Sequence, residues 1–109
     1  MAVIELDAGN PEVDGVTSEG DVSVIVIDTE KAGAGPRLHR HPYSETFVLV
    51  DGEVHFWVGD DDFVAHSHSV QVAPPMAPHR FEVTGTSHVH MVAIHASPRF
   101  ITEWLDESD

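Results

Sequence analysis

Short runs of β-branched and aromatic residues, separated by turn residues, make up most of the chain after residue 20. Turn signals recur about every 8 to 12 residues, a spacing typical of all-β sandwiches and barrels. Tandem repeats with the periods of solenoids, about 20 to 50 residues, are not apparent. We therefore predict a single all-β domain over residues 1–109 with one core. The predicted strands cover residues 21–29, 45–50, 53–58, 63–65, 70–73, 80–84 and 89–94.

Two turns and the N-terminal region can be assigned from local residue chemistry. Asp51-Gly52 lies between two strand-like runs and predicts a two-residue β-hairpin, because both turn positions favour positive φ. Residues 59–62, with the sequence Gly-Asp-Asp-Asp, predict a second, solvated turn rather than a carboxylate metal site. Residues 1–6 predict a short edge strand, and residues 7–21, rich in Asp, Gly, Pro and Ser, predict a loop.

The C-terminal residues 97–105 change from a strand-like to a helix-like pattern. Ser97 suits the N-cap of a helix and Pro98 its first position. Phe100 and Trp104 then form an apolar i,i+4 pair. We predict a short amphipathic α-helix here, packed on the sheet or on a second subunit.

Composition excludes several classes of function. The chain has 19 acidic and 5 basic residues, and its formal charge is −14. Such a surface repels phosphate backbones and anionic lipids, so we expect no nucleic-acid partner and no membrane partner. The chain has no cysteine, which excludes disulfides, thiolate metal sites and cysteine nucleophiles. A signal peptide and an apolar span of membrane length are not visible, so we expect a cytoplasmic protein.

Three potential metal ligands lie within seven residues, at His39, His41 and Glu45. On an extended strand, residues two apart point to the same face, so the two imidazoles would project together. Glu45 stays in phase if the segment after Pro42 remains extended. A fourth donor would come from another strand, and His79 is our candidate. Two imidazoles and a carboxylate facing one cavity suit a transition metal with open coordination positions.

The same stretch resembles a known family motif. Gly33, His39, His41, Glu45 and Gly52 match the first cupin motif, G-x5-H-x-H-x3-E-x6-G, at every fixed position. The second cupin motif, G-x5-P-x-G-x2-H-x3-N, is met in part. Its Pro and His fall on Pro74 and His79, whereas its two glycines fall on His68 and Met76 and its Asn on Val83. The resemblance covers roughly residues 20 to 100.

This resemblance implies a cupin jelly-roll barrel, also called a double-stranded β-helix, and a homodimer. It also implies one divalent metal ion held by His39, His41, Glu45 and His79. Mixed nitrogen and oxygen ligation leaves the choice among Fe, Mn, Ni, Co, Cu and Zn open. The leading hypothesis is a metalloenzyme acting on a small oxygenated organic substrate, dioxygenase-like with a redox metal, and an isomerase or lyase with an inert one. Glu45 is the candidate catalytic base.

Two alternatives are a non-catalytic, metal-anchored module that binds a small molecule and a protein for metal storage. Among the other histidines, we expect His66 and His68 to face solvent and one of His88, His90 and His95 to line the barrel near the metal. A substrate pocket beside the metal and a plain core use the same side chains, and both interpretations stay open here. The candidate pocket residues are Tyr43, Phe47, Trp57, Met76, Phe81 and His90.

Overall fold

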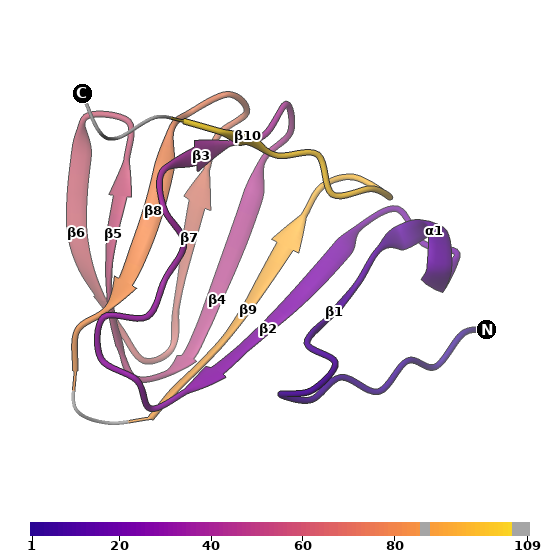
Figure 1. Cartoon of the computed structure of the whole chain (residues 1–109), viewed down its shortest axis with the longest axis horizontal. Helices are drawn as coiled ribbons and strands as arrows, with labels where there is room; N and C mark the ends of the chain where they lie inside the picture. Colours follow the sequence, from indigo (N-terminus) through magenta and orange to yellow (C-terminus); the bar gives the residue numbers. More distant parts are fainter. Residues whose placement is uncertain (86–87, 106–109) are drawn as a thin grey trace.

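Two five-stranded antiparallel sheets face one another in the computed structural model, which describes residues 1–85 and 88–105. The first sheet has the order β1-β2-β9-β4-β7 and the second the order β10-β3-β8-β5-β6 (Figure 1). This topology confirms the predicted all-β jelly roll. The strands are β1 (Glu12–Val13), β2 (Ser23–Thr29), β3 (His39–Arg40), β4 (Glu45–Asp51), β5 (Glu53–Val58), β6 (Asp61–His66), β7 (Ser69–Ala73), β8 (His79–Val83), β9 (Val89–His95) and β10 (Glu103–Trp104).

The core lies between the sheets and follows the two-residue period of the strands. In β4, β8 and β9 the odd-numbered residues are buried and the even-numbered residues face outward, apart from one exposed strand end. Phe47 and Leu49 from the first sheet meet Phe56 and Phe81 from the second in one buried cluster. The same alternation carries His79 and His95 inward, because each shares the phase of its apolar neighbours.

The predicted Asp51-Gly52 hairpin is wrong. β4 pairs with β7 and β9, whereas β5 pairs with β6 and β8, so the chain crosses from one sheet to the other at Gly52. Gly52 is needed because its φ is 106° and an added Cβ would lie 2.6 Å from a methyl carbon of Val89. Asp-Gly therefore marks a tight corner between sheets. The second predicted turn is present, as Gly59 and Asp60 connect the paired strands β5 and β6.

The predicted C-terminal helix is also wrong. Residues 96–99 form bends, residues 100–105 contain no helix, and β10 pairs with β3 in the second sheet. A nine-residue helix is marginal by itself, whereas the extended chain gains main-chain partners and an Arg40–Glu103 ion pair of 2.9 Å. The i,i+4 spacing of Phe100 and Trp104 does not distinguish a helix from a strand, because the two-residue period of a strand also places Phe100, Thr102 and Trp104 on one side. The predicted packing of this helix on a second subunit is therefore not formed, and homodimerisation stays a prediction.

The N-terminal region differs from the prediction as well. Residues 1–6 form no strand, and β1 and a one-turn helix α1 (Gly15–Ser18) lie inside the predicted loop. Asp14 caps α1 by accepting a hydrogen bond of 2.8 Å from the Thr17 amide. In the described residues no helix is long and apolar enough to cross a membrane.

The two places where the chain lacks the motif glycines keep a glycine-like backbone. His68 has a φ of 66° and Met76 a φ of 67°. Met76 is the third residue of a turn closed by a hydrogen bond of 3.1 Å from the Ala77 amide to the Pro74 carbonyl. Proline second and a positive φ third are the features of a type II turn. The turn that delivers β8 and His79 is therefore preserved at some cost in backbone strain.

Replacing Met76 with glycine is expected to stabilise the protein. Relief of the left-handed backbone is worth about 1–2 kcal/mol, and the greater freedom of the unfolded chain offsets about 0.4–1 kcal/mol of it. Urea unfolding of Met76→Gly should show a modest gain in the free energy of unfolding. Ala77→Gly is the matched control, because Ala77 has no positive φ and should lose stability. Equal losses in both variants would contradict the strain argument.

Candidate metal centre

Four buried side chains meet between the two sheets, as the sequence predicted. His39 lies on β3 directly opposite His79 on β8, His41 follows β3, and Glu45 begins β4 in the other sheet. One potential ligand atom from each lies within 4.8 Å of all the others. Their exposed fractions are 2–6%. The centre thus joins the sheets at the end of the barrel where β3, β8 and β4 come together.

The three histidines are oriented by hydrogen bonds to main-chain carbonyls. Nδ1 of His39 lies 2.8 Å from the Arg37 carbonyl, and Nδ1 of His79 lies 2.9 Å from the Ala77 carbonyl. Nδ1 of His41 lies 2.9 Å from the Ile101 carbonyl in the C-terminal segment. A carbonyl only accepts, so each Nδ1 carries the proton and each neutral ring leaves the Nε2 lone pair free. All three rings are therefore in the tautomer that ligates a metal through Nε2.

Glu45 supplies a carboxylate oxygen that contacts two of these rings. Its Oε1 lies 2.9 Å from Nε2 of His41 and 2.9 Å from Nε2 of His79. With neutral imidazoles these contacts would bring lone pairs together, which is repulsive unless a cation is shared among them. The cation can be protons on the imidazoles or a metal ion. Three imidazole nitrogens and one carboxylate oxygen fit a divalent transition metal with positions left for other ligands.

Burial and charge shift the pKa values of this group in consistent directions. Burial lowers the pKa of His39 from 6.5 to about 4, although its bond to the Arg37 carbonyl opposes the shift. Burial alone would raise the pKa of Glu45, but interactions with His41, His79 and His95 outweigh it and hold that pKa well below its usual range. His39 and Glu45 are thus held in the deprotonated forms that a metal requires.

These shifts predict how the metal-free protein responds to acid. Because the folded pKa of His39 lies below its ordinary 6.5, the unfolded chain binds more protons between pH 6.5 and about 4. Stability should hold above pH 6.5 and fall by about 3 kcal/mol as the pH drops to about 4. Glu45 adds a further loss below its ordinary pKa. The check is urea unfolding from pH 7.5 to 4, and the same pH slope in His39→Asn would contradict this assignment.

A fifth buried group, His95 on β9, completes the site. Its Nε2 lies 3.1 Å from Oε2 of Glu45, and its Nδ1 lies 2.7 Å from the Tyr43 hydroxyl. That hydroxyl accepts a hydrogen bond of 3.1 Å from the Ile101 amide, so its own proton is free to be donated to Nδ1. His95 then carries its proton on Nε2, beside Glu45 but without a hydrogen bond to it, and has the opposite tautomer from the three ligand histidines. The sequence predicts one of His88, His90 and His95 near the metal, and the burial pattern of β9 identifies it as His95.

A cavity of about 340 Å³ opens onto this centre. Trp104 lines the cavity and is 51% exposed, and its ring centroid lies 5.1 Å from that of His39. The C-terminal segment contributes one wall and the edge of β2 another. The lining residues are Glu12, Ile25, Ile27, Pro36, His39, His41, Glu45, Phe81, Ala93, His95, Phe100, Thr102 and Trp104.

The predicted pocket residues are dispersed. Phe81 lines the cavity, Tyr43 stacks on His41 behind it, and Phe47 lies in the core with its ring centroid 6.2 Å from that of His79. Trp57 stacks on His55 outside the cavity lining, and Met76 is 48% exposed beside a smaller cavity. The missed residues are mainly those of β2 and the C-terminal segment. A strand-like two-residue period over residues 100–104 would have predicted three of them, Phe100, Thr102 and Trp104.

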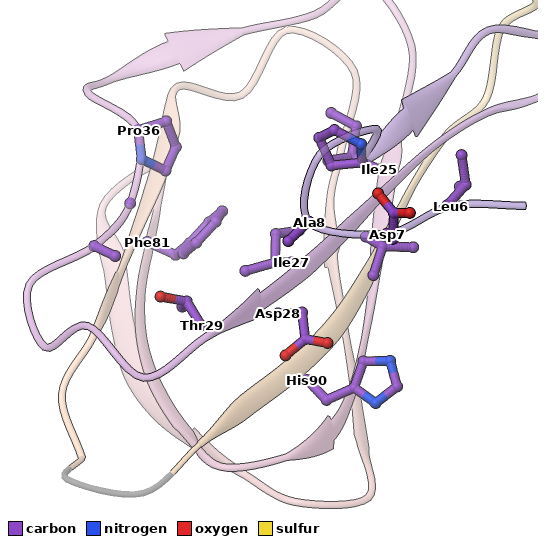
Figure 2. Close-up of a pocket in the computed structure, with 14 residues that line it drawn as sticks. Leu6, Asp7, Ala8, Ile25, Ile27, Asp28, Thr29, Pro36, Phe81 and His90 are labelled. Atoms are coloured by element: carbon purple, nitrogen blue, oxygen red, sulfur yellow. The ribbon is translucent and has the colours of Figure 1, made fainter.

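His90 lies away from the metal centre, in the lining of a larger cavity of about 650 Å³. Figure 2 shows it beside Asp28, apart from Phe81 and Pro36. The even-numbered residues of β9 face outward, which explains this position. His66 and His68 are exposed, as expected, and His88 contacts Asp28 and Glu30 at the surface. The two cavities share Ile25, Ile27, Pro36 and Phe81.

Fold and site together define a double-stranded β-helix protein with a buried centre of three histidines and one glutamate. The cupin domain family matches residues 25–95, and the chain belongs to this family. No curated protein sequence matches the chain.

Several solved structures share the fold at low sequence identity. A recombinant oxalate oxidase in complex with glycolate has a TM-score of 0.73 at 20% identity, over 85% of this chain and 52% of its own. Bacillus subtilis oxalate decarboxylase, described with Mn(II) centres, has a TM-score of 0.75 at 18% identity, over 96% of this chain and 30% of its own. An uncharacterised Klebsiella pneumoniae protein has a TM-score of 0.71 at 18% identity, over 95% of this chain and 91% of its own. The chain thus spans about half or less of the two oxalate enzymes.

Proposed function

We propose that this cupin is a metal-dependent enzyme acting on a small oxygenated organic substrate. One divalent transition metal would be held by Nε2 of His39, His41 and His79 and by Glu45. The observation that carries the proposal is the convergence of four buried donors. Nε2 of His41 and of His79 each lie 2.9 Å from one oxygen of Glu45, and a ligand atom of His39 lies within 4.8 Å of the others. The Nδ1 proton of each of the three rings is bound by a main-chain carbonyl. When bound, such an ion polarises a substrate oxygen as a Lewis acid and, if redox active, exchanges electrons.

The residues around the centre can each perform a distinct task. Glu45 presents Oε1 to His41 and His79 and Oε2 to His95, so one carboxylate connects the ligand group to a proton donor. Tyr43 and His95 hold a proton at Nε2 of His95, next to Oε2. The apolar walls of the cavity exclude water and strengthen the electrostatic interactions inside it. Proton delivery through His95 and Glu45 suits a substrate that is protonated or deprotonated beside an oxygen.

Metal analysis followed by turnover assays tests this proposal. Purified protein should hold about one transition metal ion per chain, identified by mass spectrometry, and its identity narrows the reaction type. Dioxygen consumption and product formation are then measured against phenols, keto acids and β-dicarbonyl compounds. Turnover that is lost in Glu45→Gln supports the enzyme. Stoichiometric metal with tight ligand binding and no turnover overturns it in favour of a metal-anchored binding module.

A further inference from the structure

Apart from the ligand group and the polar residues Glu12, His95 and Thr102, apolar side chains wall the metal cavity. Ile25 and Ile27 of β2, Ala93 of β9 and Phe81 of β8 form the inner walls. Phe100 packs edge-on against His95 with a centroid separation of 4.9 Å. A ligand that fills this space must therefore bury an apolar body.

The five cationic side chains of the sequence are all among the described residues, and none of them lines the cavity. Arg40 is paired with Glu103, and Arg80 packs on Trp57, on the far side of β8 from the centre. Arg37 lies against the Trp104 ring, 5.0 Å from its centroid, without lining the cavity. The remaining two cations, Lys31 and Arg99, are exposed.

The charges that do face the cavities are negative. Glu12 lies in the lining of the metal cavity, and Asp7 and Asp28 lie in the lining of the larger cavity. In Figure 2, Phe81 and Ile27, two of the four shared residues, point toward each other, while Asp7 and Asp28 lie on the other side of Ile27. With a formal charge of −14 on the chain, a small dianion would meet repulsion and no bidentate arginine.

We propose that this centre takes a neutral or singly charged ligand with two oxygens spaced to chelate one metal ion at one end and an aromatic or branched aliphatic body at the other. Enolised β-dicarbonyls and hydroxyketones belong to this class, and small dicarboxylate dianions do not. The oxygens face the metal and the apolar body lies against Ile25, Ile27, Phe81 and Trp104. This inference rests on the metal centre of the proposed function and adds the substrate class to it.

Matched probes separate the apolar contribution from the metal contribution. Protein loaded with Co(II) is titrated with acetohydroxamate, benzohydroxamate and oxalate, followed by its visible spectrum, with the retained cobalt measured after each titration. Benzohydroxamate should bind at least about tenfold more tightly than acetohydroxamate, because its ring removes more apolar surface from water. Oxalate should bind more weakly than either hydroxamate.

Two variants locate the ring in this cavity. Trp104→Ala should reduce the ratio of benzohydroxamate to acetohydroxamate affinity, because the ring loses an apolar contact. Ala93→Leu should reduce the same ratio, because the larger side chain fills part of the cavity. Trp57→Ala is the control, because that ring stacks on His55 outside the cavity lining, and it should keep the preference. The substrate class is overturned if cobalt binds stoichiometrically and oxalate binds as tightly as benzohydroxamate, or if both variants keep the wild-type preference. Failure to bind cobalt at all would instead overturn the metal centre, and the inference with it.

Discussion

Replacing His41 with alanine is expected to remove nearly all bound metal while leaving the barrel folded. The variant lacks one of three Nε2 ligands, and the cavity left behind admits water in place of the imidazole. Loss of an outer partner of a metal ligand alone costs about 10–100-fold in affinity, so loss of the ligand should exceed about a hundredfold. Metal content after dialysis, measured beside far-UV circular dichroism, checks both parts of the expectation.

His66→Ala is the matched control for this experiment. His66 is exposed at the end of β6, and its Nδ1 lies 3.7 Å from Oε2 of Glu53. Because it does not belong to the ligand group, its replacement should leave the metal content unchanged. Wild-type metal stoichiometry in His41→Ala would show that the ligand assignment is wrong. A variant that loses metal because it unfolds would be recognised by its circular dichroism, and Glu45→Gln then provides a replacement of similar size.

Replacing Gly35 with alanine is expected to cause the largest loss of stability among the glycine substitutions. An added Cβ would lie 1.9 Å from the Phe81 carbonyl oxygen and 2.9 Å from its carbon, and the φ of Gly35 is 155°. Main-chain atoms cannot move aside as a side chain can, so either β8 or the segment before β3 must shift. We expect a loss of about 3 kcal/mol or more in the free energy of unfolding.

Gly33→Ala distinguishes this steric effect from a general intolerance of the segment. Gly33 also has a positive φ, 86°, but an added Cβ would meet nothing within 4 Å. Backbone strain alone should cost about 1–2 kcal/mol there. Thermal and urea unfolding of the two variants give the comparison, and equal losses would contradict the proposed overlap with the Phe81 carbonyl.

The contrast between residues 45–58 and residues 97–105 explains which parts of the fold could be predicted. Strand positions followed from β-branched runs and turn residues, because those signals act locally. The partner of each strand did not follow: Asp51-Gly52 has the chemistry of a hairpin, yet its strands belong to different sheets. Likewise, the spacing of Phe100 and Trp104 fits a helix and an extended strand equally well. The segment is extended because its main chain pairs with that of β3, and this partner cannot be read from the local sequence.

The ligand group could be predicted from the sequence, since the two-residue spacing of an extended segment brings His39 and His41 together and the motif spacing supplied Glu45 and His79. The roles of the supporting residues could not be predicted, because His95, Tyr43 and the Ile101 carbonyl come from three separate segments. Local chemistry thus determined which atoms are able to hold a metal. Only the closure of two sheets decided which proton donor faces Glu45 and which apolar side chains surround the centre, because such contacts depend on strand pairing between distant segments.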